Sequence, residues 1–484
     1  MEKMLKDMTV FKKSGKGRNK FRMEESGIKE KEISSLIPRE LISMTAPDLP
    51  DLSENEVVRH YTNLAARNYG VDNGMYPLGS CTMKYNPKIN EAVSSMECFT
   101  NIHPVQDEAD IQGSLQVMYE LGEMLKEITG LDAVTLQPSA GAHGEFCGLL
   151  IARKFFQKEK GRKKVIIPDS AHGTNFASAA MAGFESIEIK SSKTGTIDLG
   201  TLEKVISLEK RSVALIMITN PNTLGIFEHD ILEISRMMHA NGSLLYYDGA
   251  NLNAIAGIAR PGDMGFDIAH LNLHKSFSAP HGGGGPGAGP VLVRKELKDY
   301  LPVPVIEKKG GRYILNYKLD DSIGKIKAFY GNFTVCLKAY CYLLAVGSDL
   351  KEVSTDAVLN ANYLKARLGR LFDIPYYKNT MHEFVLSAKK YKEKGISALN
   401  IAKRLIDHGV HPPTVYFPVI VEEAMMIEPT ETESIEDLDN LFNIYEKITY
   451  EAEDNPDMVR NAPISTKTAR VDELNAVKNP VFKD

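Results

Sequence analysis

The sequence predicts an α/β fold with a mainly parallel sheet in a large domain, followed by a smaller α+β domain at the C-terminal end. Between about 96 and 345, short apolar runs alternate with amphipathic stretches. Several runs are apolar on both faces, which is typical of strands covered by helices on two sides. From 346 to 484 helix patterns dominate, with few strand patterns. A chain of 484 residues is long enough for both domains.

Each element of the large domain is predicted from its own pattern. The expected strands are runs of β-branched and aliphatic residues of strand length. They are Ala133–Leu136, Val165–Ile167, Ile187–Ile189, Val213–Thr219, Leu244–Tyr247, Ile268–Leu273 and Val291–Val293. Helical periodicity marks Phe146–Phe156 and Ile231–His239 here, and Ala357–Leu371 and Ser397–His408 in the small domain, where Glu383–Leu386 is a further strand. Helices between strands in chain order indicate crossover connections and therefore parallel pairing.

Residues 1–95 differ from the rest because they have few periodic patterns and many turn-forming glycines and prolines. We expect an extended arm with short helices that lies against another subunit. Its beginning is basic, from Lys12 to Arg22, but has no apolar stretch of the kind found in a signal peptide. This pattern favours a cytoplasmic protein.

The composition excludes several classes of function. The formal net charge is −5, so nothing calls for nucleic acid or an anionic membrane surface. The apolar runs are too short to span a bilayer. The five cysteines are scattered and never spaced as CxxC, which argues against a disulfide framework and a zinc site and favours a reducing compartment. No metal site is expected.

Two charged residues follow buried strands and point to cofactor chemistry. Lys275 comes after the strand at 268–273 and before a glycine-rich loop, where a partly desolvated amine can form a Schiff base. Asp248 ends the strand at 244–247, and an acid in that position needs a positive partner. A protonated pyridinium nitrogen is such a partner, and the small Ala250 leaves room for a flat ring. The alternatives are a surface lysine and a helix N-cap aspartate.

A phosphate site is suggested by small residues between a strand and a helix. They are Ser139, Ala140, Gly141 and Ala142, and they would expose backbone N–H groups at the positive end of a helix. The segment matches neither the dinucleotide fingerprint nor the P-loop, so a dinucleotide or ATP is not favoured. Small residues also make ordinary tight turns.

Two more strand ends carry polar side chains. His172 is a candidate for stacking on a ring or for acid–base work. Asn222 follows the strand at 213–219 and could bind the phenolic oxygen of a cofactor, although an Asn-Pro pair is also a turn signal. Because parallel strands end at one edge of a sheet, an amine, a carboxylate, a ring and a phosphate cradle would converge there. Pyridoxal 5′-phosphate (PLP) accounts for all four.

At this point the motifs resemble those of a known family, the P-protein of the glycine cleavage system. The resemblance runs from about 40 to 480 and rests on Met75–Pro87, Gln137–Glu145, His172–Asn175, Asn272–Phe277, Pro280–Gly289, Tyr330–Thr334, His411–Pro418 and Glu428–Glu431. Phe176 stands where the family commonly has proline, which puts only the local loop geometry in question.

The resemblance implies the architecture of the aspartate aminotransferase class of PLP enzymes, fold type I. It implies decarboxylation of glycine with release of CO2 and transfer of the aminomethyl group to the lipoyl arm of the H-protein. The length matches the separate second subunit, so a first subunit is an expected partner, with two copies of each, and the T and L proteins of the system act indirectly. The resemblance also places His274 beside the phosphate or the Schiff base.

Other readings remain open. The chain could catalyse a different PLP reaction, such as that of an aldolase or a desulfurase, or it could be an assembly subunit with an empty pocket. Lys275 and Asp248 together argue against the second reading, because a scaffold needs neither. We also expect the segment with Cys81 and Lys84 to reach the mouth of the site, where Cys81 could be a redox-sensitive thiol.

Overall fold

The computed structural model describes residues 9–15, 27–45, 47–159, 161–285 and 287–481. These residues form two compact units, 71–469 and a second unit made of 1–70 with 470–484. The second unit holds helices α2 (Val10–Lys13), α3 (Glu54–Ala65) and α17 (Glu473–Lys478). The basic positions 16–22 of the expected arm lie outside the described residues. The domain borders expected at 95 and 345 stay predictions.

The larger unit is built on a seven-stranded sheet in the order β1-β7-β6-β5-β4-β2-β3. Its strands are β1 (Ala133–Thr135), β2 (Lys164–Pro168), β3 (Glu185–Ile189), β4 (Val213–Thr219), β5 (Leu244–Gly249), β6 (Ile268–Leu271) and β7 (Val291–Val293). Strands β3, β2, β4, β5 and β6 pair in parallel, and only β7 runs against its neighbours. The mainly parallel sheet predicted from the sequence is therefore present.

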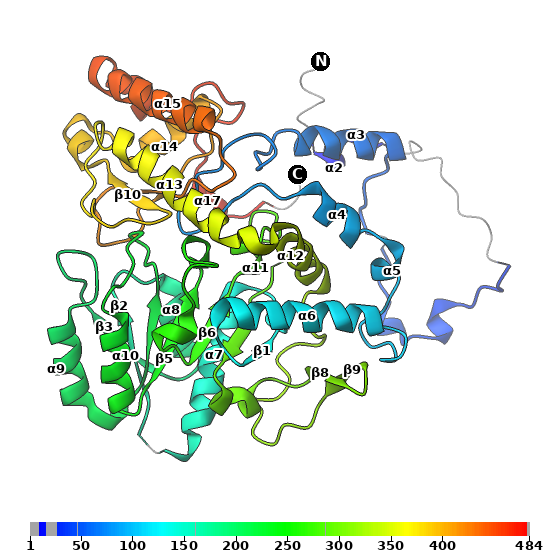
Figure 1. Ribbon diagram of the computed structural model, residues 1–484. Helices are drawn as coiled ribbons and strands as arrows, with labels where there is room; N and C mark the ends of the chain where they lie inside the picture. Colours follow the sequence, from blue (N-terminus) through cyan, green and yellow to red (C-terminus); the bar gives the residue numbers. More distant parts are fainter. Residues whose placement is uncertain (1–8, 16–26, 46, 160, 286, 482–484) are drawn as a thin grey trace. The chain divides into compact units, whose positions relative to one another are not determined.

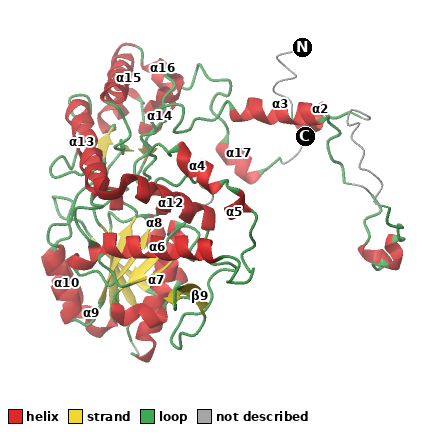
Figure 2. Ribbon diagram, turned by 45° about the vertical axis from the view of Figure 1, so that its right-hand side comes forward, coloured by secondary structure: helices red, strands yellow, loops and turns green. Residues whose placement is uncertain are grey.

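The sheet is buried on both faces because alternate strand residues enter two different hydrophobic clusters. Leu245 and Tyr247 of β5 pack with helices α6 (Gln112–Thr129), α10 (Ile231–Ala240) and α12 (Phe333–Val346). Tyr246 points to the opposite face, into the cluster of helices α7 (Gly141–Phe155) and α8 (Gly173–Met181). Helix α9 (Leu199–Glu209) lies near α10, and Figure 2 shows the yellow sheet among these helices. A period of two with both faces apolar explains the continuous hydrophobic runs.

Several strand boundaries differ from expectation by one or two residues, and those of β5 and β6 matter for the site. Strand β6 ends at Leu271 instead of Leu273, and the chain then enters a single helical turn, α11 (Leu273–Ser276), which carries Lys275. Strand β5 continues to Gly249, so Asp248 is still paired, opposite Thr219 on one side and His270 on the other. The carboxylate is thus fixed within the ladder.

The C-terminal part of the larger unit has its own small sheet, in the order β10-β12-β11 and antiparallel throughout. The strands are β10 (Phe384–Ser387), β11 (Thr414–Val415) and β12 (Ala424–Ile427). Helices α13 (Leu350–Leu368), α14 (Ala398–Asp407), α15 (Ile435–Asp454) and α16 (Pro456–Arg460) contribute to the hydrophobic cluster beside it. Figure 1 shows these elements together, in yellow to red, and the α+β prediction is confirmed.

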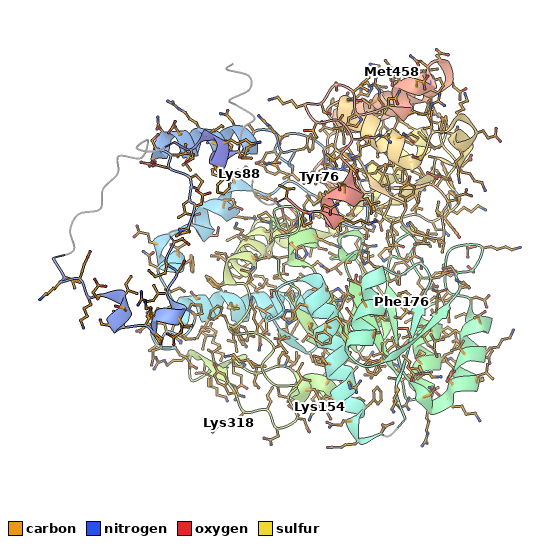
Figure 3. All side chains as sticks on the ribbon, turned by 180° about the vertical axis from the view of Figure 1, so that it is seen from behind. Tyr76, Lys88, Lys154, Phe176, Lys318 and Met458 are labelled. Carbon is orange, nitrogen blue, oxygen red and sulfur yellow. The ribbon has the colours of Figure 1, made fainter. Side chains whose placement is uncertain are left out.

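Elements with no clear pattern in the sequence complete the larger unit. They are helices α4 (Lys88–Ser94) and α5 (Glu97–Thr100) and the hairpin of β8 (Val305–Lys309) and β9 (Arg312–Asn316). Phe176, the departure from the family pattern, lies on α8 and packs partly buried against the cluster beside α7, and it is labelled in Figure 3.

One helical stretch among the described residues is long and apolar enough to cross a membrane, contrary to the expectation from the sequence. It is Phe333–Leu368, with a mean hydropathy of 1.3 in its most apolar window. The stretch comprises α12 and α13, which are separated at Gly347, where φ is +54°. Val335, Cys336 and Ala339 of α12 are buried in the hydrophobic cluster on one face of the large sheet. The apolar character of α12 is therefore used in packing within the protein.

Candidate functional site

A cavity of about 200 Å³ opens at the carboxyl ends of β4, β5 and β6, where ligands bind in open α/β sheets. Its walls come from strand ends, helix N-termini and one turn before α4. The lining residues are Ser80, Gly141, Ala142, Glu145, His172, Thr174, Thr219, Thr223, Asp248, Ala250, Asn251, His270, Asn272, His274 and Lys275. Lys275 and Asp248 therefore line one cavity, as the sequence interpretation requires.

Lys275 is presented by α11, one turn beyond the end of β6. The turn begins at Asn272, whose carbonyl accepts the Lys275 backbone N–H at 3.0 Å. The side-chain Nζ donates to the carbonyl oxygen of Ser80 at 2.8 Å. Ser80 has φ of +64°, a left-handed conformation that a serine rarely adopts, so the turn that supplies this oxygen needs support from its surroundings.

Asp248 is held as a carboxylate by three donors. Its oxygens accept the Ala250 N–H at 3.0 Å and the Thr219 hydroxyl at 3.1 Å, and the His270 Nε2 lies 3.3 Å away. Burial alone would raise the pKa of Asp248, but His270 and the Ala250 N–H outweigh it and lower the pKa. Burial lowers the pKa of His270, and the charge of Asp248 opposes that shift.

A second carboxyl group, Glu145 of α7, completes this cluster. One oxygen of Glu145, one of Asp248 and a ring nitrogen of His270 lie within 4.8 Å of one another. Burial, and then the charge of Asp248, raise the pKa of Glu145 to about 8. Two adjacent buried carboxyl groups take different protonation states, and the better hydrogen-bonded one ionises. Asp248 is therefore the anion and Glu145 the acid.

The first turn of α7 lines the cavity with backbone. A Cβ atom on Gly141 would come within 2.2 Å of the Asn272 side-chain amide nitrogen, so only glycine allows this approach. Gly141 and Ala142 face the cavity, at the N-terminus of a 15-residue helix. Ser139 and Ala140 are not among the lining residues, and the Ser139 N–H donates to His143 Nδ1 at 3.2 Å.

Two histidine rings line the cavity in neutral form. His172 caps α8, its Nδ1 accepting the Thr174 N–H at 3.2 Å, and burial lowers its pKa. His274 accepts the Ala288 N–H on Nδ1 at 3.3 Å. Burial, and then the charge of Lys275, lower the pKa of His274 to about 4. Uncharged rings suit stacking and hydrogen bonding better than binding of an anion by charge.

Asn222 is directed elsewhere. Its Nδ2 donates to the Gly195 carbonyl at 2.7 Å, and its Oδ1 accepts the N–H groups of Leu224 and Ile226 at 3.0 and 3.2 Å. The side chain thus stabilises its own turn, and it lines a smaller neighbouring pocket instead. Asn251 and Thr223 occupy the wall of the main cavity on this side.

The segment before α4 contacts the lysine-bearing turn, and its Ser80 lines the cavity, whereas Cys81 and Lys84 do not. Lys84 is 2% exposed and donates to the Ser276 carbonyl at 3.1 Å, next to Lys275. Cys81 lies 3.6 Å from His281 Nε2, and burial raises its pKa. A raised pKa keeps the thiol protonated and weakens the case for a redox-sensitive Cys81.

The cavity fits PLP in charge and shape. It offers a primary amine, an anionic carboxylate deep in the sheet, a neutral imidazole and a helix N-terminus with a glycine at its first position. The Asn272 Oδ1 is buried at the cavity wall with no hydrogen-bond partner among the described residues. A buried acceptor without a partner costs free energy, and a ligand that donates a hydrogen bond to the Asn272 Oδ1 would remove that cost.

Comparison with known proteins agrees with these features. Residues 23–314 match the model of the family described as glycine cleavage system P-protein, and 353–466 match that of the glycine dehydrogenase C-terminal domain. A probable glycine dehydrogenase (decarboxylating) subunit 2 from Thermotoga petrophila is 57% identical over 480 residues, covering 98% of this chain and 99% of the relative.

Solved structures show the same fold. The crystal structure of an inhibitor-bound glycine decarboxylase (P-protein) of the glycine cleavage system superposes with a TM-score of 0.73 at 23% identity, covering 86% of this chain and 94% of that one. A NifS-like protein gives a TM-score of 0.61 at 16% identity, covering 78% and 100%. The expected fold of the PLP-dependent transferases of type I is confirmed.

Proposed function

The chain belongs to the P-protein family of the glycine cleavage system, and on this premise we propose that it is the lysine-bearing subunit of a PLP-dependent glycine decarboxylase. It would release the carboxyl group of glycine as CO2 and pass the remaining aminomethyl group to the lipoyl arm of an H-protein. The oxidised lipoyl disulfide takes up the group and is left with one free thiol. The observation that carries the proposal is the placement of Lys275 and Asp248 in one cavity.

Each wall of the cavity has a role in this proposal. Lys275 would bind PLP through a Schiff base, and PLP when bound supplies an electron sink for the bond that breaks. Asp248, ionised within the β5 ladder, would hold the ring nitrogen in its protonated form. The N–H groups of Gly141 and Ala142 would bind the phosphate. His172 would stack on the ring, and Ala250 leaves space on the other side.

Protonation states in the cavity support this division of roles. Glu145 keeps its proton beside the anionic Asp248, so the pair carries one negative charge, which matches a single positive ring nitrogen. His274 is neutral and can donate from Nε2 while Nδ1 is occupied by the Ala288 N–H. The Ser80 carbonyl accepts a hydrogen bond from the amine of Lys275 and so sets where the linkage would form.

The proposed partners follow from the family. Relatives are named as a second subunit, so we propose a complex with a first subunit, two copies of each, which docks the H-protein transiently. The T and L proteins of the system would act on the carrier and not on this chain. A cytoplasmic location remains a prediction from the sequence.

The decisive experiment uses the complex with the first subunit. The wild type, reduced with borohydride in the presence of PLP, should carry the cofactor on the peptide that contains Lys275, and Lys275→Ala should carry none. Exchange of labelled CO2 into glycine should require the H-protein and be lost in Lys275→Ala. Labelling at another lysine, or no exchange with both partners present, would refute the proposal. Lys295→Ala, an exposed lysine after β7, is the matched control.

A further inference from the structure

A second group of buried titratable side chains lies outside the cavity, on the C-terminal part of the larger unit. His382 and Glu383 precede β10, and Glu428 follows β12. All three are at most 1% exposed, and one ligand atom of each lies within 4.8 Å of the others. The Oε2 of Glu428 and both ring nitrogens of His382 have no hydrogen-bond partner among the described residues.

Both carboxyl groups accept hydrogen bonds from the turn that contains Ser80, whose carbonyl oxygen accepts from Lys275. Glu383 accepts the Ser80 N–H on Oε2 at 2.7 Å and the Asn251 side-chain amide on Oε1 at 2.9 Å. Glu428 accepts the hydroxyl of Thr82. Ser80 is thus bound by Glu383 through its N–H and by Lys275 through its carbonyl oxygen. The left-handed conformation of Ser80 depends on these contacts.

Glu383 and Glu428 cannot both be ionised at this distance without a large energetic cost. Two negative charges this close and this deeply buried repel strongly, so one group keeps a proton. Burial raises the pKa of Glu428 to about 7, and burial together with Glu428 raises that of Glu383. The pair, rather than either residue, therefore titrates.

The charged groups around the pair are few. Lys275 faces both carboxyl groups, Lys84 and Glu431 act on Glu428, and Cys81 lies near enough for both carboxyl groups to influence its pKa. Burial lowers the pKa of His382 to about 3, so this ring adds no charge. The pair therefore adds one negative charge near Lys275, besides that of Asp248 in the cavity.

We propose that Glu383 and Glu428 share one proton and act as the positioning pair of the site, fixing the Ser80 carbonyl and placing one negative charge behind Lys275. This inference rests on the proposed function, because it concerns the lysine that binds PLP. The charge attracts a positive nitrogen at Lys275, and the hydrogen bonds to Ser80 fix the place of the carbonyl that Lys275 contacts. Neither residue lines the cavity, so neither is a catalytic residue.

The test compares single and double glutamine variants of the complex reloaded with PLP. In Glu428→Gln or Glu383→Gln the remaining carboxyl group ionises and the charge stays at one. The pH midpoint of the visible band should then stay close to that of the wild type. The double variant has no charge, and the midpoint should fall by about one pH unit, the shift expected for a unit charge within roughly 10 Å at an effective ε of about 20. Glu436→Gln, on the exposed start of α15, is the matched control.

A second readout needs no cofactor. The infrared spectrum of the wild type minus that of either single variant, at mildly alkaline pH, should show one protonated carboxyl band; the band of Glu145, which also keeps its proton, is present in both proteins and cancels. A difference spectrum of wild type and Glu383→Gln without this band would overturn the proposal. So would a folded double variant with the wild-type midpoint, or a single variant whose midpoint shifts as far as that of the double. If the wild type shows no visible band, the premise about Lys275 fails, and the infrared result still decides whether the proton is shared.

Discussion

Replacement of Lys84 by methionine tests whether a buried ion pair holds the lysine-bearing turn. The Lys84 Nζ lies 2.6 Å from Glu431 Oε1 and donates to Asn253 Oδ1 at 2.6 Å, the Ser276 carbonyl at 3.1 Å and the Tyr342 hydroxyl at 3.3 Å. Burial alone would lower the pKa of Lys84, but Glu431 outweighs it and raises the pKa, so the amine is charged. Methionine keeps the apolar stem and removes the charge.

The loss of stability expected in Lys84→Met follows from the geometry of the ion pair. At 2.6 Å the attraction amounts to about 6 kcal/mol for an effective ε of about 20, and the cost of removing both ions from water offsets much of it. Loss of Lys84 alone leaves Glu431, whose side chain is 9% exposed, without its counter-charge. We expect Lys84→Met to lower the free energy of unfolding by about 3–5 kcal/mol.

The assay is guanidinium unfolding of the purified protein, with wild type and variants compared by their midpoints and slopes. The double variant Lys84→Met with Glu431→Leu should recover most of the loss, because no isolated charge remains. Lys88→Met, which breaks the exposed ion pair with Asp72, is the control and should leave the midpoint unchanged. A Lys84→Met protein as stable as the wild type would refute the reasoning, as would a double variant no more stable than the single.

Three further outcomes are expected. Asp248→Asn should lower kcat/KM for glycine roughly 10- to 150-fold, the cost of a lost charged hydrogen bond, while the protein still folds; undiminished activity would contradict the role of the carboxylate. Cys98 is exposed, whereas burial raises the pKa of Cys81, so a limited amount of alkylating reagent should modify Cys98 first, as peptide mapping would show. Burial lowers the pKa of His382 in the folded protein to about 3, below its unfolded value of about 6.5. The unfolded state therefore binds a proton first as the pH falls, so the protein loses stability between about pH 6.5 and pH 3. His382→Gln should therefore reduce the loss of stability in acid by up to about 1.4 kcal/mol per pH unit, and an unchanged acid profile would count against a neutral ring.

The sheet could be predicted from the sequence because its strands are apolar on both faces, and β4 has the predicted bounds Val213–Thr219. The end of β6 could not, because Leu273 continues the alternation of apolar residues set by Ala269 and Leu271, and the helical turn that begins at Leu273 is only four residues long. The hairpin β8–β9 was missed for a related reason. Its strands, Val305–Lys309 and Arg312–Asn316, mix charged with apolar residues and lie largely at the surface.

Within the site, polar residues directly after strands were found because the carboxyl ends of parallel strands meet at one edge. Lys275, Asp248 and His172 all line the cavity. The same rule predicted Asn222 in the cavity, but its side chain is hydrogen-bonded to nearby backbone groups instead. Asparagine side chains often bond to local backbone in this way, and the Asn-Pro pair is only a partial sign of it. Glu383 and its contact with Ser80, 303 positions away, have no local signal at all.

The distance in sequence between these contacts has a consequence for biosynthesis. The acceptor of the Lys275 amine belongs to a turn that is hydrogen-bonded to Met426 and anchored by Glu428. A nascent chain that has just exposed Lys275 still lacks some 150 residues of this support, about a third of the polypeptide. The amine can be set in place only after almost the whole protein has left the ribosome, so truncated translation products would not mature into a cofactor-loaded form.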